Sequence, residues 1–130
     1  MERPKRRILL VDDEPSIIKM ISKRLETSGF EVVVAMDGEE AVEKAAEEQP
    51  DLIILDLMLP KLDGYQVCSQ LKEERSCLDV PVVVIFSGQE KEPAAGYCQR
   101  LGAAAYVTKT DGTPALLRKI NALLGEARAA

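Results

Sequence analysis

The 130-residue sequence predicts an α/β domain built on a five-stranded parallel sheet. Short apolar runs alternate five times with segments of helical spacing, which is the pattern of repeated βαβ units. The longest run, Val80–Phe86, is apolar throughout, as expected of a strand that is covered by helices on both faces. Proline and glycine separate the runs, so each run fits a single element.

The predicted strands are apolar segments bounded by turn-forming residues: Arg7–Val11, Phe30–Met36, Leu52–Leu55, Val80–Phe86 and Ala103–Val107. A helix is expected after each strand. The first helix begins at Pro15 and is stopped by Gly29. Asp37 and Glu40 have the spacing of a capping box for the second helix, which ends before the next strand.

The remaining helices follow the last three strands. The third begins after a loop at Pro60–Gly64, and the last begins at Pro114. The fourth covers Pro93–Leu101 and contains Gly96, so we expect it to be intrinsically weak and mobile. Alternating strands and helices favour the doubly wound, flavodoxin-like (βα)5 fold with strand order 2-1-3-4-5. We assign residues 1–125 to one domain and residues 126–130 to a C-terminal tail or the start of a linker.

The composition excludes several classes of function. The net charge of −5, from 22 acidic and 17 basic residues, disfavours direct contact with nucleic acid. No apolar run approaches the length of a membrane span, and we see no signal peptide. The three cysteines have no metal-like spacing, so we expect free thiols and a cytoplasmic location without membrane insertion.

The chain contains no histidine. Serine–histidine and cysteine–histidine nucleophiles are therefore excluded, and so is metal binding through imidazole. Any metal ion must be held by oxygen, which favours Mg²⁺ or Ca²⁺.

Polar side chains follow four of the predicted strands. Asp12 and Asp13 follow the first strand, Asp56 the third, Ser87 the fourth and Lys109 the fifth. Each alone has an ordinary explanation, since acidic residues form turns and caps and lysines face solvent. Parallel strands end at one edge of the sheet, and ligands bind there where the strand order reverses. The five side chains together therefore predict a site.

Three carboxylates at one edge repel one another and need positive charge nearby. Mg²⁺ and a lysine supply that charge, and Mg²⁺ binds through few carboxylates and a substrate phosphate. Asp56, at the centre of the sheet, is the candidate nucleophile for a phosphoryl group. Asp12 and Asp13 are candidate metal ligands, while Lys109 and Ser87 are expected to bind phosphoryl oxygens.

Five stretches together carry a resemblance to a known family: Leu10–Glu14, Asp56–Pro60, Asp63-Gly64, Ser87-Gly88 and Gly102–Lys109. In order and spacing they resemble the receiver domain of two-component response regulators, and the chain is similar to the single-domain chemotaxis-type members. The resemblance covers the chain from about Lys5 to Leu124.

The resemblance implies that Asp56 takes a phosphoryl group from a histidine kinase or histidine phosphotransfer protein. It implies that Mg²⁺ is held by Asp12, Asp13, Asp56 and the backbone carbonyl of Met58. The chain is then not a turnover enzyme, although it catalyses its own phosphorylation and slow autodephosphorylation. The downstream effector is not identified by the sequence.

The resemblance also implies a switch made of Ser87 and Tyr106. We expect the Ser87 hydroxyl to turn toward the phosphoryl group and Tyr106 to rotate inward, which changes the surface of the fourth helix, fifth strand and fifth helix. Two positions depart from the family pattern: Gly88 stands where alanine is usual, and Thr110 where proline is usual. A cis bond before a non-proline residue costs ~2.5–4 kcal/mol, so we expect a trans Lys109–Thr110 bond.

Two other functions compete with this interpretation. A haloacid-dehalogenase-type phosphatase also uses an aspartate nucleophile with Mg²⁺, but that family has an Asp-x-Asp motif after its first strand. This chain has Asp12-Asp13-Glu14-Pro15 there and is short for that fold. A binding module that is never phosphorylated is the other alternative. Such degenerate receivers usually lack an acidic or lysine position of the site, and this chain lacks none.

Overall fold

The computed structural model describes residues 5–74, 82–88 and 93–125. Five parallel strands pair in the predicted order, β2-β1-β3-β4-β5. The strands are β1 (Arg7–Val11), β2 (Glu31–Ala35), β3 (Leu52–Leu55), β4 (Val82–Ser87) and β5 (Ala105–Thr108). The helices are α1 (Pro15–Thr27), α2 (Gly38–Glu48), α3 (Gly64–Glu74), α4 (Ala94–Arg100) and α5 (Gly112–Leu124), with a 3₁₀ helix at Lys109–Asp111.

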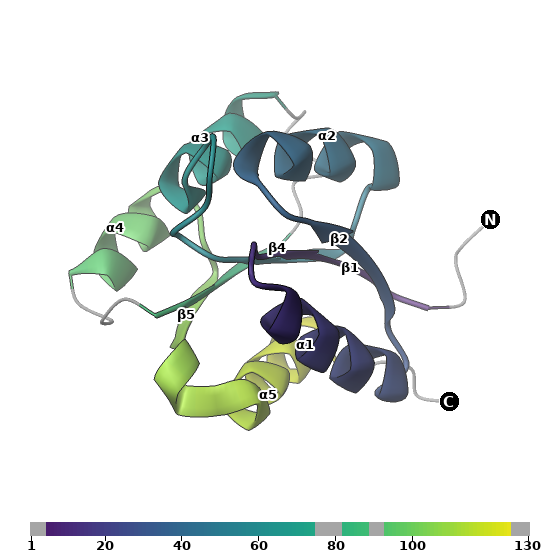
Figure 1. Ribbon diagram of the computed structural model, residues 1–130. Coiled ribbons are helices and arrows are strands. Elements are labelled where there is room, and N and C mark those ends of the chain that lie inside the picture. The colour runs from purple at the N-terminus through teal and green to yellow at the C-terminus, as the bar shows by residue number, and fades with distance from the viewer. Residues whose placement is uncertain (1–4, 75–81, 89–92, 126–130) are drawn as a thin grey trace.

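Helices cover both faces of the sheet (Figure 1). α1 and α5 lie on one face, and α2, α3 and α4 lie on the other. In β3, Ile53 and Leu55 join the core beneath α2, α3 and α4, while Leu52 and Ile54 join the core against α1 and α5. Burial on two faces explains why this strand is apolar at every position.

α1 and α4 end in the same hydrogen-bonded turn. Gly29 and Gly102 follow the two helices with φ of 99° and 106°, values that favour glycine. The next residues, Phe30 and Ala103, each donate a backbone hydrogen bond of 3.0 Å to the carbonyl five residues earlier. This Schellman motif uses the N–H groups of Phe30 and Ala103 to close the helices. Both strands therefore begin later than predicted.

The start of α2 differs in one bond from the predicted capping box. The Asp37 side chain accepts a hydrogen bond of 2.8 Å from the N–H of Glu40, as expected. The Glu40 carboxylate accepts at 2.8 Å from the N–H of Met36 instead of from Asp37. Met36 thus belongs to the cap, and β2 ends one residue earlier than predicted, at Ala35.

The later elements also shift slightly. β4 extends to Ser87, while its predicted start at Val80 lies outside the described residues. Pro93 and Leu101 cap α4 rather than belonging to it. α5 begins two residues before Pro114, because a capping box within Thr108–Asp111 forms the preceding turn. The trans geometry expected for the Lys109–Thr110 bond stays a prediction.

α4 packs against α3 through aromatic side chains. The ring centroids of Tyr65 and Tyr97 lie 5.0 Å apart, with the rings tilted by 53°. The Arg100 guanidinium lies 5.7 Å from the Tyr97 ring centroid, and Cys98 on the same helix is buried. An aromatic pair such as Tyr65–Tyr97 contributes about 0.5–1.5 kcal/mol beyond burial. This pair links the short helix α4 to α3.

Gly64 packs directly against the chain that follows β3. A Cβ atom there would lie 2.6 Å from the Asp56 carbonyl oxygen and 2.7 Å from the Leu57 Cα. We predict that Gly64→Ala lowers the free energy of unfolding by about 1–3 kcal/mol, the usual cost of overpacking. Gly88→Ala is the matched control, because its Cβ would meet nothing within 4 Å. Urea unfolding of both variants tests this, and equal stability of the two would contradict it.

Candidate functional site

The carboxyl edge of the sheet places two aspartates at its centre. Asp12 follows β1 and Asp56 follows β3, the two strands between which the strand order reverses. Their backbone N–H groups continue the ladder, to Ala35 at 3.2 Å and to Val11 at 3.1 Å. Both residues are buried, with exposed fractions of 2% and 5%. The fold thus holds two carboxylates side by side away from water.

Asp13 completes an acidic cluster with these residues. One carboxylate oxygen from each of Asp12, Asp13 and Asp56 lies within 4.8 Å of the others. Asp13 is exposed, so the cluster opens to solvent on its side. The structure therefore brings together the three acidic residues that the sequence predicts for the site.

Lys109 bridges the cluster from the turn after β5. Its Nζ lies 3.0 Å from Asp12 Oδ2 and 3.1 Å from Asp56 Oδ2. Burial alone would lower the pKa of Lys109, but hydrogen bonds to Asp12 and Asp56 and their charges outweigh it and raise the pKa. The ammonium group is therefore charged at neutral pH and serves as the counterion of the two buried carboxylates.

The ionised form of Asp12 is disfavoured even with Lys109 beside it. Burial raises the pKa of Asp12 and the negative charge of Asp56 adds to this, against the hydrogen bonds from the Glu14 backbone and Lys109. The raised pKa means that the bonds from Glu14 and Lys109 do not fully offset the cost of burying the ionised carboxylate. A further positive charge here would stabilise the ionised form.

Glu14 belongs to the site although the sequence argument gave it no role. Its carboxylate lies 3.2 Å from Lys109 Nζ, and its backbone N–H donates at 3.0 Å to Asp12 Oδ1. One signal was available in the sequence. Glutamate stands at the N-cap of α1, where serine, threonine, aspartate and asparagine are preferred.

Ser87 and Tyr106 lie on neighbouring strands behind the cluster. Ser87 is fully buried at the end of β4, and its side chain hydrogen bonds to that of Tyr106 on β5. Burial raises the pKa of Tyr106, while the bond with Ser87 lowers it. In this structure the two side chains are already bonded, and Tyr106 packs against the core on the α2–α3–α4 side. The inward rotation of Tyr106 that we expect on phosphorylation stays a prediction.

The chain after Asp56 is held close to the cluster. The backbone N–H of Met58 donates to Asp56 Oδ1 at 3.3 Å, and the N–H of Gly64 donates to the Leu57 carbonyl at 3.0 Å. The Met58 side chain is 64% exposed. This turn places the Met58 backbone beside the acidic cluster.

The donor set of the cluster suits a hard divalent cation. Asp12, Asp13 and Asp56 offer only carboxylate oxygens, which Mg²⁺ and Ca²⁺ prefer. Burial and the Asp56 charge raise the pKa of Asp12, and a bound cation would favour its ionised form. The residues present therefore fit Mg²⁺.

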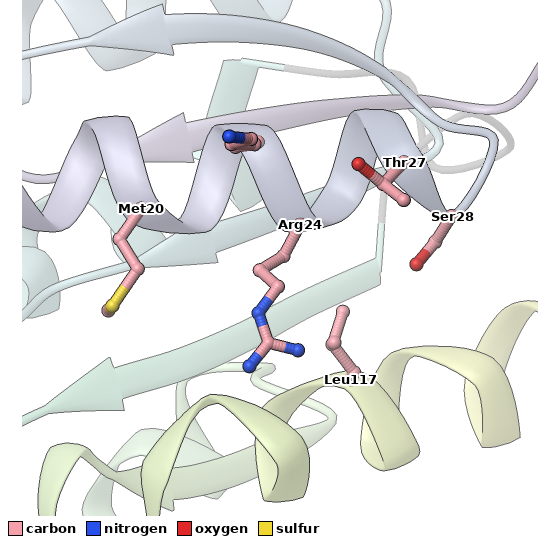
Figure 2. Close-up of a pocket in the computed structure, with 6 residues that line it drawn as sticks. Met20, Arg24, Thr27, Ser28 and Leu117 are labelled. Atoms are coloured by element: carbon pink, nitrogen blue, oxygen red, sulfur yellow. The ribbon is translucent and has the colours of Figure 1, made fainter.

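A separate groove lies between α1 and α5. It has a volume of about 340 Å³ and is lined by Met20, Lys23, Arg24, Thr27, Ser28 and Leu117. Figure 2 shows the Arg24 side chain extending from α1 toward Leu117 on α5. The lining has two cationic side chains and no carboxylate, so this groove is not a metal site.

The helices of the described ranges 5–74, 82–88 and 93–125 are too short or too polar to cross a bilayer. The cysteines described, Cys68 and Cys98, are free and buried. Burial raises the pKa of Cys68 to about 12, so this thiol is unreactive at neutral pH.

Fold and site together define a doubly wound α/β protein with its ligand site at the carboxyl edge of the sheet. A model of the response regulator receiver domain matches residues 8–121. The chain belongs to this family, which places it in two-component signalling. This assignment is not compatible with the haloacid-dehalogenase alternative.

Known proteins agree with this assignment. PhoP of Bacillus subtilis, an alkaline phosphatase synthesis transcriptional regulatory protein, is 45% identical over 118 residues, which cover 90% of this chain and 46% of PhoP. The chain thus spans about half the length of this curated relative. The BeF3-activated N-terminal receiver domain of Klebsiella pneumoniae RstA is 29% identical with a TM-score of 0.82, and the match covers 90% of this chain and 97% of that domain.

A CheY-like receiver domain protein of Methanospirillum hungatei is also similar. It is 28% identical with a TM-score of 0.83, over 93% of this chain and 94% of its own. The flavodoxin-like fold predicted from the sequence is therefore confirmed.

The raised pKa of Asp12 leads to a prediction about stability. Between the usual pKa of 3.8 and the raised value, the folded protein binds a proton more tightly than the unfolded chain, so ionised Asp12 lowers stability as pH rises. We expect Asp12→Asn, without Mg²⁺, to raise the free energy of unfolding at pH 7 by about 0.5–2 kcal/mol. Lys109 keeps Asp56 and Glu14 as partners. The gain should shrink as pH falls toward 4.

Urea unfolding at several pH values measures this effect. Asp13→Asn is the control, because its carboxylate is exposed and its removal should change stability less. A lower stability of Asp12→Asn at pH 7 would show that the bond with Lys109 outweighs the cost of burying Asp12.

Proposed function

We propose that Asp56 accepts a phosphoryl group from the phosphohistidine of a histidine kinase or of a histidine phosphotransfer protein, with Mg²⁺. The observation that carries the proposal is the buried Asp56 carboxylate, 3.1 Å from Lys109 Nζ within the acidic cluster of a receiver domain. The chain has no histidine of its own, so the phosphohistidine comes from another protein.

The transfer forms one bond and breaks another. A carboxylate oxygen of Asp56 attacks the phosphorus atom, the phosphorus–nitrogen bond breaks, and the imidazole leaves with the electron pair. The product is an acyl phosphate on Asp56. Lys109 lies 3.1 Å from Asp56 and hence within reach of a phosphoryl oxygen, and the Ser87 hydroxyl donates to another oxygen.

We propose that Asp12, Asp13, Asp56 and the backbone carbonyl of Met58 hold Mg²⁺. The support is the clustering of the three carboxylates and the position of Met58 beside Asp56. When bound, the ion neutralises charge on the carboxylates and on the phosphoryl oxygens. The positive charge of the ion would also offset the burial and the neighbouring Asp56 charge, which together raise the pKa of Asp12.

We propose that the chain is not a turnover enzyme. Asp56 is itself the group that is modified, so each phosphorylation leaves the protein in a new state rather than restoring it. Slow hydrolysis of the acyl phosphate then resets the switch. The free thiols Cys68 and Cys98 support a cytoplasmic location, where two-component partners would meet this domain.

We propose that the output surface consists of α4, β5 and α5. The hydroxyl groups of Ser87 and Tyr106 are bonded to each other here, and a phosphoryl group on Asp56 would compete for Ser87. When Ser87 bonds to the phosphoryl group instead, Tyr106 is released and repacks on β5. A ligand shifts such an equilibrium only by its differential affinity for the two states, and the Ser87 bond supplies that difference.

The partner of this surface is proposed to be another protein or domain. PhoP is named a transcriptional regulatory protein, and the chain spans about half its length. The receiver domain itself carries a net charge of −5, which disfavours contact with DNA phosphates. We therefore propose that it acts through protein contacts rather than by binding nucleic acid.

Phosphorylation of Asp56 is directly testable. Intact-protein mass spectrometry after incubation with acetyl phosphate and Mg²⁺ should show one phosphoryl increment, which chelation of Mg²⁺ abolishes. Asp56→Asn should show none, because the amide is not a nucleophile of this kind. An increment that persists in Asp56→Asn would refute the site, and an unlabelled wild type would favour the non-phosphorylated binding module.

The relay through Ser87 makes a second prediction. Ser87→Ala should still be phosphorylated, since Asp56 and Lys109 are intact, but the amide shifts that beryllofluoride induces in residues 93–106 should shrink by at least half. Tyr106→Phe, which keeps the ring and loses the hydroxyl, is the matched variant. Shifts of equal size in wild type and Ser87→Ala would mean that Ser87 is not the relay.

A further inference from the structure

Glu14 makes contacts that the proposed phosphoryl transfer does not explain. It is the N-cap of α1, yet its side chain makes no capping hydrogen bond. Its carboxylate lies instead 3.2 Å from the Nζ of Lys109, 95 positions further along the chain. The side chain of Glu14 thus makes a long-range contact and no local capping bond.

An ammonium group has three N–H donors, and three carboxylates surround the Nζ of Lys109. The nearest oxygens of Asp12, Asp56 and Glu14 lie at 3.0, 3.1 and 3.2 Å. Glu14 differs from the other two in two respects. Its side chain is 59% exposed, and its carboxylate is outside the group of three that clusters within 4.8 Å.

This difference matters once the site is in use. A phosphoryl group occupies an oxygen of Asp56, and a cation at the cluster engages Asp12, so both acceptors are withdrawn from Lys109. Lysine has a flexible four-carbon stem and is strongly hydrated, so an unheld Lys109 would turn toward water. Glu14 is the acceptor that remains on the solvent side of Nζ.

We propose that Glu14 is a positioning residue for phosphoryl transfer, which holds the Lys109 ammonium group at the site while Asp12 and Asp56 are engaged. The inference rests on the proposed function of Asp56. Glu14 leaves two of the three N–H donors free for phosphoryl oxygens. It touches neither the phosphoryl group nor the nucleophile, and acts through Lys109.

The direction of the change in phosphorylation rate distinguishes a positioning role of Glu14 from a simple effect of its negative charge. Phosphoryl donors are anions, so removal of a nearby negative charge should by itself speed their approach. Loss of a positioning contact should instead slow phosphorylation. The expected loss is about two- to fivefold, since exposed ion pairs are weak.

The experiment compares Glu14→Gln and Glu14→Asp with wild type, using acetyl phosphate at saturating Mg²⁺ and mass spectrometry for the initial rate. Glu14→Asp keeps the charge but is one methylene shorter, so both variants should be slower by about two- to fivefold if reach to Lys109 matters. Glu43→Gln removes the same charge from an exposed position of α2 and should match or exceed the wild-type rate.

The NMR signal of the Lys109 ammonium group gives a readout that a purely structural role would not move. With beryllofluoride and Mg²⁺ it should stay protected from water exchange in wild type and Glu43→Gln, and lose protection in both Glu14 variants. A Glu14→Asp rate equal to wild type, or a faster Glu14 variant, would overturn the inference about Glu14 and leave the proposed function of Asp56 standing. A wild type that is not labelled would overturn the proposed function with it.

Discussion

The ammonium group of Lys109 lies between two buried carboxylates, and the arrangement of the whole carboxyl edge depends on this contact. Asp12 and Asp56 are 2% and 5% exposed, so water does little to stabilise their charges. Among the residues that the structure describes, Lys109 supplies the cation between them. Its removal would leave two buried like charges, a far larger cost than loss of a surface ion pair. The ion pair between Lys109 and Asp56 therefore stabilises the fold, whatever chemistry takes place at Asp56.

The parallel sheet explains why the central residues of the site were predictable. Asp12 and Asp56 directly follow two apolar strands, and the flavodoxin-like order chosen from the sequence makes these strands neighbours. Glu14 was missed because its contact spans 95 positions and depends on a side-chain conformation, which no local pattern encodes. The late starts of β2 and β5 were missed for a related reason. Gly29 predicted where the helix ends, but not that the backbone N–H of Phe30 would bond to a carbonyl of that helix.

The bond between Ser87 and Tyr106 shows a different limit of sequence reasoning. Strand alternation and register place the two residues on adjacent strands near the same edge. The burial of Tyr106 and the orientation of its hydroxyl depend on packing against the core from α3 and α4, which the sequence does not specify. In this structure the two side chains are already hydrogen-bonded to each other, so the rotation of Tyr106 expected from the sequence would have to begin by breaking this bond.

The wide sequence separation of Asp12, Asp56 and Lys109 has a consequence for synthesis on the ribosome. Asp56 lies 53 positions before Lys109, and Lys109 is in the last fifth of the chain. Chains are made from the amino terminus at roughly 5–20 residues per second, so the acidic half of the site exists for several seconds before its cation. Pairing of β1 with β3 during this interval would bring two carboxylates together before Lys109 is available. We expect their repulsion to disfavour that pairing until Lys109 has been synthesised.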